Sequence, residues 1–180
     1  MATIDQITTA AQLFEANVPH CELIAGELVM MSPAGFNHGR FALRIGAALD
    51  NFVTPRGLGF VVSAEAGFQI AHDPDTVRAP DVAFVRAERI PPGGVKGFFQ
   101  GVPDIAVEVV SPNDRASEVI AKSQDWLQAG CQMVWVVDPQ TRTVSVYRSR
   151  SEISVLTAEE TLSGGDVLPG FSVPVAAIFT

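Results

Sequence analysis

The stretch that decides the fold is Asp104-Ile105-Ala106-Val107-Glu108-Val109-Val110. After its first residue only Glu108 interrupts the apolar run, which is typical of a central strand buried on both faces of a sheet. Side chains alternate along a strand, so Glu108 shares its face with Ala106 and Val110. A carboxylate in such a run is costly to ionise unless another group pairs with it. The stretch therefore predicts a central strand with a carboxylate that needs a partner.

The segments on either side of this strand predict an α/β (α+β) fold. Asn37 can cap a helix that runs to about Phe52. Ser111-Pro112-Asn113-Asp114 ends the central strand and opens a helix to about Ala129, with Gly130 as its C-cap. The other expected elements are a helix at 5–17, a hairpin at 21–31 turning at Ala25-Gly26, strands at 59–71, 81–86 and 133–137, a turn at 72–75, a hairpin of 143–148 with 153–157, and a loop with a short helix from Leu168 onward.

The predicted order of the core is helix, three strands, helix, strand. This α-β-β-β-α-β order predicts a mixed central sheet flanked by helices, with extra β-hairpins at both ends. No repeat, low-complexity tract or linker divides the chain, so we expect one domain over residues 1–180.

Composition excludes several classes of protein. The hydrophobic fraction of 47% excludes a disordered or collagen-like chain. We expect no secretory signal and no membrane helix, because no basic and then apolar N-terminal region and no long uninterrupted apolar stretch is present. The two cysteines lack CxxC spacing, which argues against a zinc site and is typical of a protein in the reducing cytoplasm.

The charge balance bears directly on nucleic-acid binding. The chain has 12 Lys and Arg against 20 Asp and Glu, for a net charge of −8. A domain that binds duplex DNA by itself usually has a basic face, because affinity comes largely from neutralising phosphates. Affinity for DNA would have to come from a local patch, a bound metal or a partner.

Asp81 and Glu108 form a candidate metal pair. Asp81 follows Pro80 at the start of one predicted strand, and Glu108 lies in the next long one. Mg²⁺ prefers oxygen ligands, commonly one or two carboxylates with waters and a substrate phosphate. The two carboxylates and the carbonyl of Val109 could supply the protein's share. The alternative is that Glu108 pairs with Arg78 and that Asp81 completes a turn after proline.

Three stretches together resemble the Uma-two family of restriction-endonuclease-like proteins. They are Ala79-Pro80-Asp81-Val82-Ala83-Phe84-Val85, then Asp104 to Pro112, then Trp135-Val136-Val137-Asp138-Pro139. The early stretch from Glu22 to Pro33 and the late Leu168-Pro169-Gly170-Phe171 agree as well. The family is similar to PD-(D/E)XK nucleases. The resemblance implies cleavage of DNA with Mg²⁺, or Mn²⁺ as a substitute, at Asp81 and Glu108.

The chain departs from the superfamily motif at its lysine. The motif places a lysine two residues after the strand carboxylate, where this chain has Val110. Lys122 on the following helix resembles the migrated lysine of other members, with Trp126 one turn later as a supporting aromatic residue. Its predicted role is to stabilise charge or orient water, beside a helix face formed by Val119, Ile120, Ser123 and Leu127. The alternative is a surface ion pair of Lys122 with Glu118, four residues earlier.

His38 and Glu65 are further candidates. His38 lies in the opening turn of the first long helix. Members of the superfamily often have an acidic residue there that supports the metal, and the resemblance to the Uma-two family implies a His in its place. The alternative is an ordinary core histidine. Glu65 is expected in a strand beside that of Asp81. It is either a third acidic ligand or the partner that orients Lys122 or Arg78.

Arg40, Arg44 and Arg78 are candidate phosphate contacts. Arg40 and Arg44 are one turn apart on the outer side of the first long helix, so a solvated face is the alternative.

Three functions remain open from the sequence. The first is a Mg²⁺-dependent endonuclease, the second a catalytically degenerate module that binds nucleic acid or an unidentified protein, and the third a metal hydrolase of another phosphorylated substrate. A basic rim around Asp81, built from Arg40, Arg44, Arg78, Arg115 and Lys122, would favour the first function. An acidic rim would favour the second or third. We also expect a homodimer formed through the exposed hairpins.

Overall fold

The central sheet has six strands in the order β11-β10-β9-β8-β6-β3. This computed structural model describes residues 7–112 and 114–180. The strands are β3 (Gly59–Ser63), β6 (Val82–Arg86), β8 (Ile105–Val109), β9 (Met133–Asp138), β10 (Thr143–Tyr147) and β11 (Ile153–Leu156). β8 pairs parallel with β9 and antiparallel with β6, so the sheet is mixed as predicted.

β8 confirms the strand predicted at 104–110. All five of its residues are buried. Ile105, Val107 and Val109 pack in the core on one face of the sheet, and Ala106 packs in the core on the other. Glu108 shares the face of Ala106 and is buried there.

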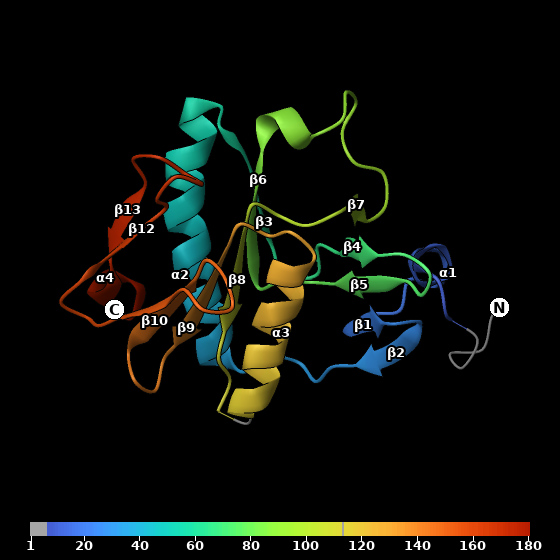
Figure 1. Cartoon of the computed structure of the whole chain (residues 1–180), viewed down its shortest axis with the longest axis horizontal. Helices are drawn as coiled ribbons and strands as arrows, with labels where there is room; N and C mark the ends of the chain where they lie inside the picture. Colours follow the sequence, from blue (N-terminus) through green and yellow to red (C-terminus); the bar gives the residue numbers. More distant parts are fainter. Residues whose placement is uncertain (1–6, 113) are drawn as a thin grey trace.

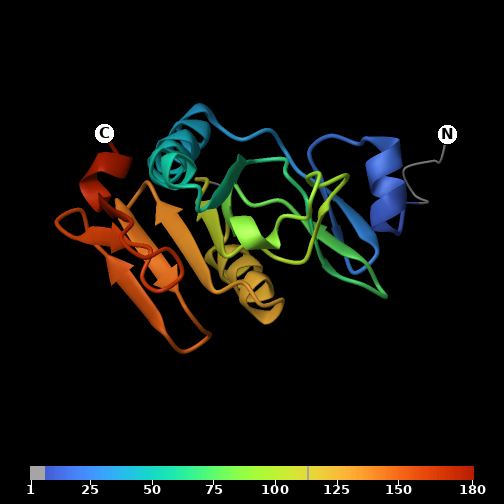
Figure 2. The same cartoon turned by 90° about the horizontal axis from the view of Figure 1, so that it is seen from above.

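Helices cover the two faces of this sheet. α2 (Phe36–Val53) lies on one face and α3 (Ala116–Gln128) on the opposite one (Figures 1 and 2). α2 begins one residue before the predicted cap, with Gly35 at its N-cap. Its apolar stripe packs on β6 and β8, and the C-terminal segment joins that layer with β12 (Thr161–Ser163), β13 (Ser172–Pro174) and α4 (Val175–Ile178).

α3 begins at Ala116, just after the segment 111–114 predicted to end the central strand. It ends at Gln128, two residues before Gly130, which has a φ of +104°. Ser123 and Trp126 are its buried residues. The prediction that Ile120 faces the core is wrong, because that side chain is exposed. The buried stripe instead passes through the Lys122 side of the helix.

A second, smaller sheet has the order β2-β1-β5-β4-β7. Its strands are β1 (Cys21–Ile24), β2 (Glu27–Met30), β4 (Phe68–Ala71), β5 (Thr76–Arg78) and β7 (Phe99–Gln100), with α1 (Ala10–Ala16) beside it (Figure 2). The β1–β2 hairpin turns at Ala25-Gly26 as predicted. Residues 5 and 6 of the predicted first helix, and Asn113, lie outside the described residues.

The prediction of one strand over 59–71 is wrong. The chain leaves the central sheet after β3, turns, and enters the small sheet as β4. The turn at 72–75 therefore joins β4 to β5, not to β6. The predicted core order survives as α2-β3-β6-β8-α3-β9, with this β4–β5 hairpin inserted between β3 and β6. Two short 3₁₀ turns, η2 (Thr54–Arg56) and η3 (Ala87–Arg89), complete the elements.

The hairpin predicted at 143–148 and 153–157 is confirmed as β10 and β11 at one edge of the central sheet. Within the described ranges, no helix combines the length and apolar character that a membrane crossing requires.

Candidate active site

A cavity of about 1430 Å³ opens where the small sheet meets the end of the central sheet. Its walls come from the β1–β2 hairpin, the loop that leads into α2, the end of β8 and the first half of α3. Asp81, Glu108 and Val109 line it together with Lys122 and His38. Folding thus brings together residues that the sequence separates by up to 84 positions, from His38 to Lys122.

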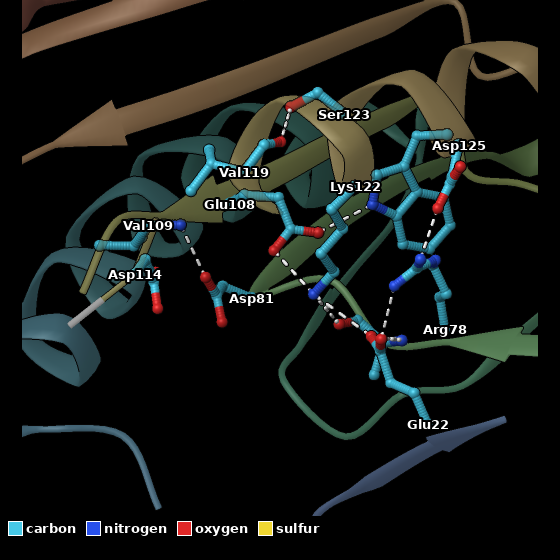
Figure 3. A network of polar contacts seen from close by, with 12 residues as sticks. Glu22, Arg78, Asp81, Glu108, Val109, Asp114, Val119, Lys122, Ser123 and Asp125 are labelled. Atoms are coloured by element: carbon cyan, nitrogen blue, oxygen red, sulfur yellow. Dashed lines mark hydrogen bonds and ion pairs between the residues drawn. The ribbon is translucent and has the colours of Figure 1, made fainter. Parts of the chain in front are cut away.

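Asp81 is held beside Glu108 by the pairing of β6 with β8. The antiparallel register sets Val82 opposite Val107, which places Asp81 next to Glu108 at the same end of the sheet. The Asp81 amide donates to the carbonyl of Val107 at 3.0 Å. Its carboxylate Oδ2 accepts a hydrogen bond from the amide of Val109 at 2.6 Å (Figure 3). These contacts fix the orientation of the carboxylate.

His38 contacts the same carboxylate from the first turn of α2. Its Nε2 lies 3.1 Å from Asp81 Oδ2. This hydrogen bond raises the pKa of His38, although burial acts to lower it. The structure thus places His38 against a predicted metal ligand and not in an apolar core.

Glu108 lies almost entirely out of solvent, with 7% of its surface exposed. Its Oε1 accepts a hydrogen bond from Trp126 Nε1 at 2.8 Å, and its Oε2 pairs with Lys122 Nζ at 2.9 Å. Burial raises the pKa of Glu108 to about 7; Asp81 raises it as well, while Lys122 and Trp126 act to lower it. Trp126 is itself fully buried behind the carboxylate.

Lys122 reaches from α3 into a cluster of acceptors. Its Nζ lies 2.9 Å from Glu108 Oε2, 3.2 Å from Glu22 Oε1 and 3.2 Å from the carbonyl of Ala79 (Figure 3). Burial acts to lower the pKa of Lys122, but the nearby carboxylates of Glu108, Glu22 and Asp81 outweigh it and raise the pKa. Lys122 is therefore an ammonium group at neutral pH.

The alternative pairing of Lys122 with Glu118 is wrong. The Glu118 carboxylate accepts a hydrogen bond from the Arg115 amide at 3.2 Å, at the N-terminus of α3. Val110, at the strand position of the motif lysine, donates its amide to the Val137 carbonyl at 2.9 Å. The cation of the site comes from the helix and not from the strand.

Glu22 is a buried residue of the site that the sequence reading missed. Its carboxylate accepts hydrogen bonds from Arg78 Nη1 at 2.7 Å and from the Ala79 amide at 3.1 Å, besides the contact with Lys122. The available signal was an acidic residue in the apolar strand Cys21-Glu22-Leu23-Ile24, the same signal as at Glu108. Glu22 connects the small sheet to Arg78 and Ala79, just before Asp81, and to Lys122 on α3.

Arg78 is also built into this network. It pairs with Glu22 and with Asp125, and it is only 8% exposed. The alternative in which Arg78 pairs with Glu108 is wrong, because Lys122 takes that place. The predicted phosphate contact is also wrong, since both terminal nitrogens of Arg78 are engaged by carboxylates.

Three other predicted residues have no contact with this network. Glu65 is exposed in the turn between β3 and β4, with its carboxylate 3.3 Å from His20 Nδ1. The prediction that it orients Lys122 or Arg78 is wrong, and Glu22 occupies that place. Arg40 and Arg44 are exposed on α2 and are not among the residues that line the cavity.

Comparison with known proteins decides the family. The Uma2 family, described as "Putative restriction endonuclease", matches residues 7–176. The chain belongs to the Uma2 family. A solved structure described as a "putative nuclease belonging to DUF820" from Anabaena variabilis ATCC 29413 has the same fold, with a TM-score of 0.81 and 21% sequence identity over 95% of this chain and 97% of that one. No match was found among curated proteins. The Uma2 assignment supports a nuclease.

The rim of this Uma2 cavity is acidic, which contradicts the basic rim expected for unaided DNA binding. The carboxylates on its walls belong to Glu22, Glu65, Asp81, Glu108, Asp114 and Glu118. Of the predicted basic residues, only Arg78 and Lys122 line it, and both are paired with carboxylates. Net attraction of phosphate to these walls therefore requires an additional cation.

Asp81 and Glu108 offer the kind of oxygen donor that a divalent metal ion takes from a protein. Within residues 7–112 and 114–180, no cluster of three or more His, Cys, Asp or Glu side chains is arranged to hold a metal. Mg²⁺, however, usually takes one or two carboxylates and completes its octahedron with water and phosphate oxygen. Asp81 and Glu108 meet that requirement, because both are carboxylates beside a cavity with room for water. These two carboxylates fit a divalent metal ion.

Proposed function

We propose that this Uma2 protein is a divalent-metal-dependent endonuclease that hydrolyses phosphodiester bonds of DNA at Asp81 and Glu108. The observation that carries the proposal is the placement of two carboxylates at one end of neighbouring strands, with the Lys122 ammonium 2.9 Å from one of them. Two carboxylates and an adjacent cation suit a reaction in which negative charge develops on phosphate oxygens.

Asp81, Glu108 and the carbonyl of Val109 would hold the metal. Mg²⁺ or Mn²⁺, when bound, supplies a Lewis acid that lowers the pKa of water and stabilises charge on phosphate. Burial of Glu108 favours this role, because a buried carboxylate is stabilised by a cation brought against it. The Val109 amide keeps Asp81 oriented.

Lys122 would stabilise the charge on the phosphate or orient the attacking water. In the hydrolysis, water oxygen attacks phosphorus, one P–O ester bond breaks, and the departing oxygen takes up a proton while the water loses one. The Lys122 ammonium stays charged at neutral pH and is held by Glu22 and the Ala79 carbonyl. Such a fixed cation needs no reorganisation when charge develops.

His38 and Trp126 would act by holding the two carboxylates. His38 would orient Asp81 from α2 on one face of the sheet, and Trp126 would orient Glu108 from α3 on the other face. Side chains that hydrogen-bond to metal ligands keep those ligands in the geometry that metal binding requires.

The test is cleavage of supercoiled plasmid and of single-stranded DNA in Mg²⁺, in Mn²⁺ and in EDTA. The variants are Asp81→Ala with Glu108→Ala, and Lys122→Met. Glu65→Ala is the matched control, because it removes a carboxylate of the same cavity that is exposed and paired with His20 rather than with Asp81, Glu108 or Lys122.

The expected result is cleavage that requires metal, survives in the Glu65 variant and disappears in the double variant. Loss of Lys122 should slow cleavage by about 100-fold or more, as for removal of one group that stabilises charge in the transition state. Wild-type protein that leaves both DNA substrates intact at excess enzyme with either metal would contradict the proposal.

The acidic rim favours a second candidate function, a degenerate member of the fold that binds a protein partner or nucleic acid without cleaving it. Such a protein would bind its partner equally well in the Asp81 and Glu108 double variant. The third candidate, a metal hydrolase of a smaller phosphorylated substrate, would release phosphate in a metal-dependent way from a phosphomonoester while leaving DNA intact.

We further propose a cytoplasmic protein. Cys21 and Cys131 are both free thiols, which suits a reducing compartment.

A further inference from the structure

The cavity that contains Asp81 and Glu108 has a second wall that is apolar. Phe14 from α1 and Phe98 from the loop before β7 meet edge to face, with ring centroids 5.5 Å apart. Met30 and Met31, at the end of β2, line the same cavity and are exposed, and Phe14 is 55% exposed. Grouped apolar side chains that remain exposed beside a polar site usually contact a ligand.

The charges of this cavity disfavour a paired duplex as its occupant. A duplex presents closely spaced phosphates on its outside and is held mainly by lysine and arginine. The two basic residues on these walls, Arg78 and Lys122, are already paired with carboxylates. In a duplex the base faces are also stacked inside the helix, so they cannot reach a wall beside the scissile phosphate.

An unpaired strand avoids both obstacles, because its phosphate charge is less dense than that of a duplex and its base faces are free. When the phosphate lies at the carboxylates, a neighbouring base is free to turn away from the backbone. Aromatic side chains then offer it a flat surface, and stacking of bases on such side chains tolerates any sequence. The wall and the carboxylates belong to one cavity, so both can contact one nucleotide segment.

We propose that the substrate is a nucleic-acid strand that is unpaired at the scissile phosphate, and that a base next to this phosphate stacks on the wall formed by Phe14, Met30, Met31 and Phe98. The inference rests on the proposed nuclease function and names the substrate class of that same site.

The experiment compares one labelled DNA sequence in three forms: single-stranded, fully paired, and paired with an unpaired tail. Cleavage is measured in Mg²⁺, and binding is measured separately in EDTA by fluorescence anisotropy. The variants are Phe14→Ala and Met30→Ser, and the matched control is Phe60→Ala. Phe60 lies on β3 outside the cavity lining and is 54% exposed, nearly the same as Phe14.

The expected result is faster cleavage of the single strand and of the tail than of the paired form. Phe14→Ala should weaken cleavage and binding of the single strand by about 10-fold, as expected for loss of one base-stacking side chain. Met30→Ser should act in the same direction and provides the test if Phe14→Ala unfolds, which circular dichroism would show. Phe60→Ala should behave as the wild type.

The outcomes separate this inference from the proposed function. If the paired form is cleaved as fast as the single strand and the two wall variants change nothing, the inference is wrong and the nuclease proposal stands. If no DNA is cleaved but the single strand binds in a Phe14-dependent way, the nuclease proposal fails and the wall remains a site for unpaired bases. Concentration-dependent self-association that Phe14→Ala abolishes would assign the wall to a second copy of the chain and overturn the inference.

Discussion

Glu108 and Lys122 form a buried ion pair between the central sheet and α3. The carboxylate would be costly to ionise without the ammonium and the Trp126 indole, and the ammonium is held by Glu22 as well. Buried ion pairs of this kind seldom increase stability over an apolar pair of the same volume. The pair therefore fits the proposed role of Glu108 and Lys122 at the cavity better than a role in stability.

The raised pKa of Glu108 predicts how stability changes with pH. Between its ordinary pKa of 4.5 and the folded value of about 7, the folded chain holds a proton that the unfolded chain releases. The free energy of unfolding should therefore fall as pH rises through this window. Urea denaturation of the metal-free protein at pH 5 and pH 8 measures the change.

Glu108→Gln is the control for that prediction, since glutamine does not titrate. Relative to this variant, the wild type should lose stability between pH 5 and pH 8. An equal pH dependence in both proteins would show that another group is responsible.

Glu22 predicts a second effect at the residue scale. Glu22→Ala would leave Arg78 with Asp125 alone and Lys122 with Glu108 as its remaining carboxylate partner. Loss of one partner from a buried charged group costs about 3 kcal/mol or more, so the urea midpoint should fall clearly. Glu65→Ala should change the unfolding free energy by less than about 1 kcal/mol, because its pair with His20 is exposed. Similar losses in both variants would argue against the role of Glu22.

At the scale of elements, β3 and β6 approach each other closely at Gly59. A Cβ at this position would lie 2.1 Å from the carbonyl oxygen of Val85. Gly59→Ala should therefore separate the first residue of β3 from the last residues of β6 and lower the unfolding free energy by about 2 kcal/mol or more. Thermal unfolding followed by circular dichroism measures the effect.

Gly39 in α2 is the matched control for Gly59. A Cβ there meets no other described atom within 4 Å, and alanine favours helix over glycine by about 0.5–1 kcal/mol. Gly39→Ala should therefore raise the melting temperature while Gly59→Ala lowers it. A loss of stability in both would mean that glycine is needed in α2 for a reason other than space.

At the scale of the whole molecule, β11 ends the central sheet at an open edge. Ile153 and Val155 alternate on this strand and are both exposed. Two copies of such an edge can pair antiparallel about a two-fold axis. The homodimer predicted from the exposed hairpins remains a prediction, and we place its interface at β11.

Val155→Lys tests this interface, because two lysines brought face to face repel each other and charge blocks edge pairing. Light scattering should find a dimer for the wild type and a monomer for the variant. Phe60→Lys, at the opposite edge of the same sheet, should leave the dimer intact. A wild-type monomer at high protein concentration would refute the prediction.

The sequence by itself determined the central part of the fold and pointed to the two carboxylates that we propose as metal ligands. The run from Ile105 to Val110 has only one polar residue, so burial on both faces was readable without knowing its neighbours. Asp81 and Glu108 followed from the same pattern and from the Uma2 resemblance. Lys122 was placed by helical periodicity, although Ile120 of the same helix was assigned to the wrong face.

Only the tertiary structure decided where the strand after β3 goes and which charges meet. Residues 59–71 have the composition of one strand, and their division between two sheets depends on pairing partners far along the chain. Glu22 and Glu65 are both acidic residues expected near strands, yet one is buried against Lys122 and the other is exposed beside His20. The physical reason is that burial and pairing of a charge are set by contacts between distant segments, which local pattern does not record.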